Sequence, residues 1–145
     1  MLRAKFFVAF SIVAASSAWA AEYGTAQEAK VMLEKAVAEV KANKSAALQK
    51  FAKGEGGFKD RDLYPFCGGP DGNFTAHPTL TGQSLKGLQD KAGKPLGEEI
   101  YQTAETGKVS EVSYMWPRPG ATEPVQKVSY VTKVDDQVCA VGYYK

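Results

Sequence analysis

The sequence predicts a single α+β domain, and three observations support this class. Apolar residues recur at helical spacing over residues 26–43. From residue 63 onward, short runs rich in β-branched and aromatic residues alternate with Gly and Pro, which predicts antiparallel strands. The expected order is helix, helix, two strands, helix and three strands, with no internal repeat and no second domain. Helices segregated around antiparallel hairpins make an α+β fold.

The first helix has the clearest signal. Thr25 and Glu28 have the spacing of a capping box, in which each side chain bonds the backbone amide of the other residue. One face of the following segment is apolar and the other carries Lys and Glu. We expect a helix of about 18 residues that ends near Asn43.

Two shorter helices are also expected. The first begins with Ser45 as its cap and ends at Gly54. The second follows Pro95, includes Ala104 and is closed by Gly107. Both are therefore bounded by residues that are typical of helix ends.

Five strands are predicted. Residues 63–67 and 73–77 form a hairpin around a Gly/Pro turn, and the last three strands run over residues 109–116, 125–134 and 137–144. Neither set of alternate positions in the last three strands is wholly polar, so both faces of the sheet are expected to be covered.

A long segment over residues 79–94 separates the hairpin from the third helix. Apart from Leu85 and Leu88 it is mostly polar and glycine-rich. We expect a loosely structured excursion, and long loops in compact domains commonly act as lids over binding sites.

The chain opens with the pattern of a secretory signal peptide. Arg3 and Lys5 precede an apolar run over residues 6–15, and small residues lead up to Ala20. An uncleaved anchor is the alternative, but the run is short for a membrane span. We expect a signal peptide over residues 1–20, cleavage after Ala20, and a periplasmic or secreted domain over residues 21–145.

Charge argues against a nucleic-acid partner. The formal net charge is +2, and it falls to 0 once Arg3 and Lys5 are removed with the signal peptide. The remaining lysines are scattered, whereas a nucleic-acid surface needs a basic stripe. At this size one domain buries about two thirds of the surface of its unfolded chain, so it can fold without stabilising cross-links.

Cys67 and Cys139 are the only cysteines. An even number in an exported chain favours a disulfide, and both lie in predicted strands that could be neighbours. Two buried free thiols are the alternative. With His77 as the single histidine, a metal site is disfavoured, and no cofactor is expected.

The segment from Tyr114 to Tyr130 is the most informative about function. Two predicted strands meet there at a Pro/Gly loop that places aromatic rings beside well-spaced cations. Rings supply apolar walls, and Lys127 and Arg118 supply donors, so the combination suits a pocket for a small anion.

Three polar residues are candidates for such a pocket, each with a plainer alternative. Lys127 lies within a strand that faces a covered side, where a carboxylate ligand would balance its charge; otherwise its stem covers apolar surface and its head reaches water. Arg118 carries a fork suited to carboxylate, although loop cations usually face solvent. His77 is either a contact at the pocket rim or a strand-end residue that bonds the following loop.

Four aromatic residues are candidate walls, with tyrosine hydroxyl groups as orienting donors. These are Tyr101, Tyr114, Trp116 and Tyr130. Aromatic residues at strand spacing belong more often to the core, which is the alternative for each. Trp116 is the strongest candidate because it lies where a strand meets the loop.

The order of several motifs resembles single Cache domains. Two of these motifs are consecutive: Tyr114-Met-Trp-Pro-Arg-Pro-Gly120 and then Pro124-Val-Gln-Lys-Val-Ser-Tyr-Val131. Three others also match: Phe74-Thr-Ala-His-Pro78, the Leu-x-Asp-x-x-Gly-Lys-Pro run ending at Pro95, and the closing segment from Val138. The resemblance covers nearly all of the chain after residue 20. It implies a five-stranded PAS-like sheet with the long first helix on one face and a ligand pocket on the other.

The resemblance also implies a function. Single Cache domains sense small carboxylates or amino acids outside the cell for chemotaxis receptors or histidine kinases. We therefore expect an exported sensor that binds a small organic anion. Since no membrane helix or output domain is expected after Lys145, a membrane receptor or kinase would be its partner. If the ligand is an amino acid, Asp90 or Glu98 is expected to bind its ammonium group.

Two other functions remain open. One is a protein-interaction module whose pocket is closed. The other, least favoured, is a small periplasmic enzyme, which would need an activated nucleophile or a paired acid and base. The sequence has no Gly-x-Ser-x-Gly turn, and no Cys/His arrangement extends beyond His77.

Overall fold

The computed structural model describes residues 21–145, so the predicted signal peptide lies outside the described residues. The described helices and strands follow the predicted order: α1 (Ala26–Ala42), α2 (Lys44–Lys53), β1 (Pro65–Gly68), β2 (Phe74–Ala76), α3 (Leu96–Thr103), β3 (Ser110–Pro117), β4 (Pro124–Val134) and β5 (Gln137–Tyr144). Among these described helices, none combines the length and apolar character that crossing a membrane requires.

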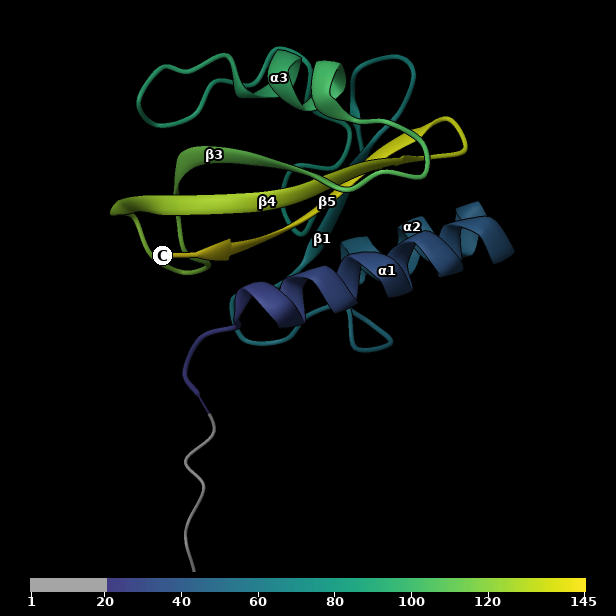
Figure 1. Ribbon diagram of the computed structural model, residues 1–145, viewed down its shortest axis with the longest axis horizontal. Coiled ribbons are helices and arrows are strands. Elements are labelled where there is room, and N and C mark those ends of the chain that lie inside the picture. Colours follow the sequence, from purple (N-terminus) through teal and green to yellow (C-terminus); the bar gives the residue numbers. More distant parts are fainter. Residues whose placement is uncertain (1–20) are drawn as a thin grey trace, which may run out of the picture.

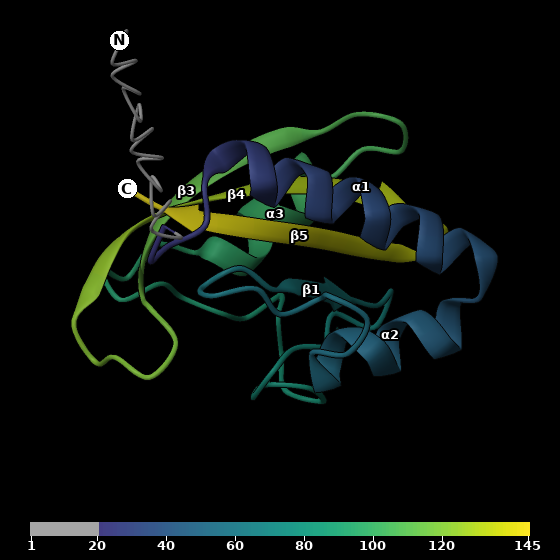
Figure 2. The same ribbon diagram turned by 90° about the horizontal axis from the view of Figure 1, so that it is seen from below.

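The strands form one antiparallel sheet in the order β2-β1-β5-β4-β3. Helices α1 and α2 cover one face, while α3 and the loops before it cover the other (Figure 1). Seen from below, α1 runs along β5, and α2 lies beside β1 (Figure 2). The predicted α+β class, the five-stranded sheet and the long first helix on one face are confirmed.

Each face of the sheet has its own apolar core. The core under α1 and α2 is centred on Leu33, Phe51 and Val141, and the core under α3 on Leu85, Ile100 and Val131. The alternation along the strands places successive residues in opposite cores. The prediction that both faces are covered is therefore confirmed.

Helix ends follow local chemistry, with two corrections. The capping box is present, with the Glu28 amide donating to Thr25 Oγ1 at 3.2 Å. The second helix is capped by Asn43 rather than by Ser45, because the extended backbone of Asn43 lets its side chain accept from the Ala46 amide at 3.1 Å. Helix α3 ends at Thr103 rather than near Gly107, since the chain becomes extended directly after it.

The 79–94 segment is more ordered than expected. The Phe74 amide donates to the carbonyl of Gln83 at 2.8 Å, and the Gly82 amide donates to the carbonyl of Phe74 at 2.9 Å. Further along, the Met115 amide donates to Asp90 Oδ2 at 2.9 Å, which ties the segment to the edge strand β3. These bonds, which polar composition does not reveal, make the segment an ordered cover over the sheet.

The two cysteines form the predicted disulfide. Cys67 in β1 and Cys139 in β5 are direct cross-strand partners, with Cα atoms 4.1 Å apart. Both side chains are buried in the core under α1.

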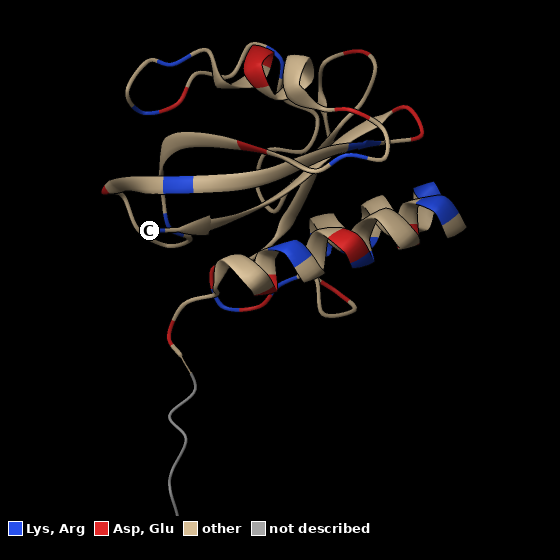
Figure 3. Ribbon diagram, viewed as in Figure 1, with Lys and Arg blue, Asp and Glu red and all other residues tan. Residues whose placement is uncertain are grey.

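Charged residues of both signs are spread along α1 and over the loops, with no massed region of one sign in the view of Figure 3. A charge that matters for function must therefore be sought locally, in the core under α3.

Candidate functional site

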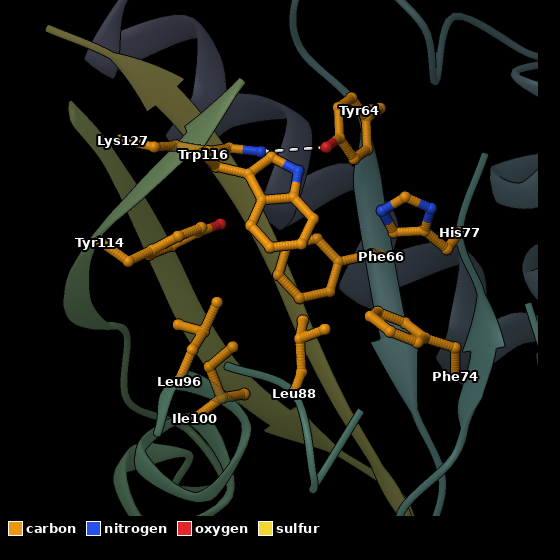
Figure 4. A pocket seen from close by; sticks show the side chains of 10 residues that line it. All are labelled: Tyr64, Phe66, Phe74, His77, Leu88, Leu96, Ile100, Tyr114, Trp116 and Lys127. Atoms are coloured by element: carbon orange, nitrogen blue, oxygen red, sulfur yellow. Dashed lines mark hydrogen bonds between the residues drawn. The ribbon is translucent and has the colours of Figure 1, made fainter. Parts of the chain in front are cut away.

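A small cavity lies between the sheet and the cover formed by α3 and the 79–94 segment. Its lining is almost entirely apolar or aromatic, with Lys127 and His77 as the exceptions (Figure 4): Tyr64, Phe66, Phe74, His77, Leu88, Leu96, Ile100, Tyr114, Trp116 and Lys127. The cavity leaves about 10 Å³ for the centre of a water molecule. That is room for about one water.

Lys127 is the most unusual residue of this cavity. Its side chain is only 1% exposed, and Nζ donates to the hydroxyl group of Tyr64 at 3.1 Å. Four aromatic rings lie around Nζ, with centroids 4.4 Å (Tyr64), 5.0 Å (Tyr144), 5.9 Å (Tyr114) and 6.0 Å (Phe66) away. Among the described residues no carboxylate pairs with it. An isolated buried ammonium group is costly, so Lys127 is the leading candidate for a functional residue in this cavity.

The surroundings keep this ammonium group charged. Burial lowers the pKa of Lys127, and the hydrogen bond to Tyr64 together with the faces of the surrounding aromatic rings opposes this by favouring the charged form. Burial raises the pKa of Tyr114 and Tyr144, so both hydroxyl groups hold their protons at neutral pH. The cavity therefore presents one fixed positive charge and several hydrogen-bond donors.

Space for the Lys127 stem depends on Gly142. This glycine is the cross-strand partner of Ser129, two positions beyond Lys127 in β4. A Cβ atom at residue 142 would collide with Lys127 Cε and would lie 2.5 Å from Ser129 Oγ. The absent side chain thus lets the lysine lie flat across the sheet.

We expect Gly142→Ala to destabilise the protein by about 1–3 kcal/mol, because overpacking forces neighbouring side chains out of their rotamers. Urea unfolding measures the change. Ser113→Ala, at an exposed position of β3, is the control and should leave stability nearly unchanged. An unfolding free energy for Gly142→Ala equal to that of the wild type would contradict the role of this glycine.

His77 contributes a second polar group. Its Nδ1 accepts hydrogen bonds from the amides of Thr79 at 3.0 Å and Leu80 at 3.1 Å. Because Nδ1 accepts, the single proton of the neutral ring must reside on Nε2. Figure 4 shows one ring nitrogen turned toward the cavity. The two predicted roles of His77, a bond to the following loop and a place at the pocket, are thus both present in its geometry.

The same environment makes His77 a source of acid sensitivity. Burial, aided by the nearby charge of Lys127, lowers its pKa from 6.5 to about 4. A base with a depressed folded-state pKa binds protons more readily when unfolded, so stability must fall as the pH drops from 6.5 toward 4. The lowering of the His77 pKa from 6.5 to about 4 corresponds to a loss of about 3 kcal/mol over this window.

Chemical denaturation at several pH values measures this loss. His77→Asn is the matched variant, because an amide oxygen can accept the same two backbone bonds without titrating. The difference between wild type and variant removes the contribution of the carboxylates. A pH dependence that is the same in both proteins would show that His77 is not responsible.

Tyr114 and Trp116 form one wall of the cavity from β3. The hydroxyl group of Tyr114 lies 2.7 Å from Ser129 Oγ, and its ring packs edge-on against Trp116 with centroids 6.4 Å apart. Trp116 is only partly buried, and Lys91 Nζ lies 5.2 Å from its ring centroid on the outer side. Trp116 therefore separates the cavity from solvent.

The remaining candidates lie elsewhere. Tyr101 packs against the same core but donates to the carbonyl of Gly69 at 2.7 Å and does not line the cavity. Tyr130 does not line the cavity either, because it has the opposite parity to Lys127 and packs beside Tyr143 under α1, with ring centroids 5.8 Å apart. Arg118 lies outside the cavity wall.

Sequence reasoning missed six lining residues. They are Tyr64, Phe66, Phe74, Leu88, Leu96 and Ile100. Tyr64 and Phe66 occupy alternate positions at the first predicted strand, which places both on one face, and this signal could have identified them. Leu96 and Ile100 share a helix face through their i, i+4 spacing, but nothing local shows which sheet face that helix covers.

An open vestibule of about 440 Å³ adjoins the cavity. Tyr64, His77 and Trp116 line both spaces and so form the wall between them. The rim carries four cationic side chains and no carboxylate among its lining residues: Lys59, Arg61, Lys91 and Arg118. The rim therefore carries positive charge, part of which is paired with Glu28, Asp60 and Asp62 outside the lining.

Neither Asp90 nor Glu98, the two residues expected to receive a ligand ammonium group, faces the cavity. Oδ1 accepts from the amides of Ala92 and Lys94 at 2.9 and 2.8 Å, and Oδ2 accepts from the amide of Met115. Glu98 is exposed, and neither residue lines the cavity. The described lining contains no acidic group to receive an ammonium ion.

Comparison with known proteins identifies the fold. A methyl-accepting chemotaxis protein of Pseudomonas putida, McpP, is 39% identical over 56 residues, a match that covers 39% of this chain and 10% of that protein. A crystal structure of a methyl-accepting chemotaxis protein from Vibrio parahaemolyticus aligns with a TM-score of 0.66 at 23% identity, covering 81% of this chain and 86% of that one.

Two further solved structures are similar. A periplasmic sensor domain of a chemotaxis protein has a TM-score of 0.61 at 29% identity, covering 81% of this chain and 88% of its own. A Cache chemosensory domain, described by its carboxylic acid recognition, has a TM-score of 0.57 at 27% identity, covering 81% of this chain and 86% of that one. The family model of single Cache domain 2 matches residues 9–143. The chain therefore belongs to the single Cache domain 2 family of sensory domains.

Proposed function

We propose that this protein is an exported chemosensory domain that binds a small carboxylic acid in the cavity around Lys127. One observation carries the proposal: a fully buried, charged lysine lies among aromatic rings with no carboxylate partner in the described chain. A ligand carboxylate would supply that missing charge, with Nε2 of His77 and the hydroxyl group of Tyr64 as further donors. Rings would pack against its short carbon chain.

The comparisons support this class of ligand and this setting. One similar structure is a Cache chemosensory domain described by its recognition of carboxylic acid, and another is a periplasmic sensor domain. Membership of a sensory family also supports binding rather than catalysis. A membrane receptor or histidine kinase would read the ligand-bound state.

The cavity restricts ligand size. With about 10 Å³ for a water centre, even a two-carbon acid requires an outward shift of Trp116 or Leu88. An acid of four or five heavy atoms reaches about −6 to −7.5 kcal/mol at best, so dissociation constants from micromolar to millimolar are expected.

The same lining disfavours amino acids. An α-ammonium group would lie near the charge of Lys127 with no acidic side chain to receive it. Like charges brought together in a dry site cost several kcal/mol. We therefore expect acetate, propionate and pyruvate to bind, and glycine and alanine of matching size not to bind.

Thermal shift and calorimetry with these matched pairs test the proposal. A ligand at a thousand times its dissociation constant should add about 4 kcal/mol of stability. Mass spectrometry of the freshly purified protein would detect an acid retained from the host. If neither acids nor amino acids raise the melting temperature, and no ligand is retained, the proposal fails.

The closed cavity favours a second candidate, a protein-interaction module with no small ligand. In that case Trp116 and Lys127 are permanent core residues. The same titrations separate the two functions, because this module would respond to no acid at any concentration.

A further inference from the structure

The size and the cationic lining of the vestibule suit it to bind part of a ligand as well as to admit one. It has about 440 Å³, compared with about 10 Å³ in the inner cavity, and the two are separated only by the side chains of Tyr64, His77 and Trp116. A ligand that displaces this wall would extend naturally into the vestibule. The groups on the vestibule side then decide what the outer end of that ligand can be.

Arg118 is held in place on that side. Its guanidinium lies over Tyr23, 4.1 Å from the ring centroid, and over Tyr144, 5.1 Å from the centroid. Nε lies 3.5 Å from Oδ2 of buried Asp62 without forming a hydrogen bond. Two flanking prolines restrict the backbone. A fixed guanidinium loses little entropy on binding.

The two Nη atoms of Arg118 form no hydrogen bond among the described residues. Its Nε forms an ion pair with Asp62 Oδ2 at 3.5 Å, while Asp62 Oδ1 accepts from the Gly24 amide at 2.7 Å. Of the other rim cations, Lys59 and Lys91 form no ion pair in the described chain, whereas Arg61 is bound by Glu28 and Asp60. The outer space thus contains donors suited to a carboxylate.

Arg118 and Lys127 are close enough to bind one small molecule. Both lie over the ring of Tyr144, Lys127 Nζ at 5.0 Å and Arg118 Cζ at 5.1 Å from its centroid, so these two atoms can be at most 10.1 Å apart. A carboxyl carbon lies roughly 3.5 Å from a cation that it bonds. One or two carbon atoms between two carboxyl groups therefore suffice to bridge the pair.

Resting on the proposed function, we propose that the vestibule is an outer subsite for a second acidic group, and that the preferred ligands are short dicarboxylates such as malonate or succinate. One carboxylate binds Lys127 in the inner cavity, and the other binds the fork of Arg118, with Lys91 adding charge at the rim. Trp116 lies between the two subsites and packs against the connecting carbons.

Calorimetry at pH 7.5 with three pairs of acids tests this inference: malonate against propionate, succinate against butyrate, and adipate against hexanoate. We expect malonate or succinate to bind at least about tenfold more tightly than its monoacid, because a charge-assisted bond is added. Adipate should gain less, since its carboxyl groups are too far apart.

Two variants locate the outer subsite. Arg118→Lys keeps the charge beside Asp62 but loses the fork, and should bring diacid affinity down to within about threefold of the monoacid. Lys91→Gln removes an exposed charge that lies over the outer side of Trp116, and it should weaken diacids several-fold while changing monoacid affinity much less. Lys35→Gln, exposed on α1, is the charge-matched control and should change neither class.

The outcomes separate this inference from the proposed function. If diacids bind no more tightly than monoacids, or if both rim variants weaken the two classes equally, the outer subsite is refuted while monoacid binding at Lys127 stands. If no acid of either class binds, both ideas fail. Should Arg118→Lys unfold, the result for Lys91→Gln decides.

Discussion

Lys127→Met is expected to abolish acid binding while the protein remains folded. Methionine has a similar length and can pack among the same aromatic rings, but it offers no charge to a carboxylate. Losing one partner of a buried charge pair costs about 2–5 kcal/mol, so affinity should fall by at least about thirtyfold. Acids that raise the melting temperature of the wild type should then have no measurable effect.

Lys133→Met is the matched control for this result. It removes the same charge from the same strand, but Lys133 is exposed and lies on the outer part of β4. Acid binding to this variant should equal that of the wild type. A Lys127→Met protein that still binds acids with unchanged affinity would show that the buried ammonium group is not the anchor.

Removing the disulfide is expected to have the largest effect on stability. Cys67 and Cys139 are separated by 72 positions, and closing a loop of that length stabilises the fold by about 4 kcal/mol on the chain-entropy model. The double variant Cys67→Ala/Cys139→Ala should therefore melt about 10–15 °C lower. Urea unfolding followed by circular dichroism measures the difference.

Reduced wild-type protein provides the control. With both sulfur atoms still present, dithiothreitol should reproduce most of the loss, which separates the effect of the bond from the effect of smaller side chains. Unfolding free energies within about 1 kcal/mol for the oxidised and reduced proteins would argue against a stabilising bond.

Much of the fold could be predicted because its elements have strong local signals. The Thr25 capping box, the αL glycine at residue 54 and the alternation in the last three strands each depend on residues close in sequence. The cap of the second helix was assigned wrongly because Asn43 and Ser45 are both good caps, and only the path of the backbone selects between them.

The candidate site was harder to predict because it joins distant segments. The alternation of side chains along the last strands predicts which face of the sheet Lys127, Tyr114 and Trp116 occupy. Their contact with Tyr64 and Leu88, however, depends on how the sheet and its cover assemble. The same alternation argues against Tyr130 as a pocket residue, because it lies three positions after Lys127 in β4 and its side chain therefore points to the opposite face of the sheet. The role of Asp90 cannot be predicted from the sequence, because the backbone amide of Met115 reaches its carboxylate only in the folded chain.

The bond between β1 and β5 has one further consequence. Residues 68–138 all lie within the covalent ring that it closes, and they include the cover, α3 and Lys127. A protease that cuts once within this ring, for instance in the exposed turn around Gly120, leaves two fragments that stay joined. A nicked molecule therefore retains all the residues that line the cavity around Lys127.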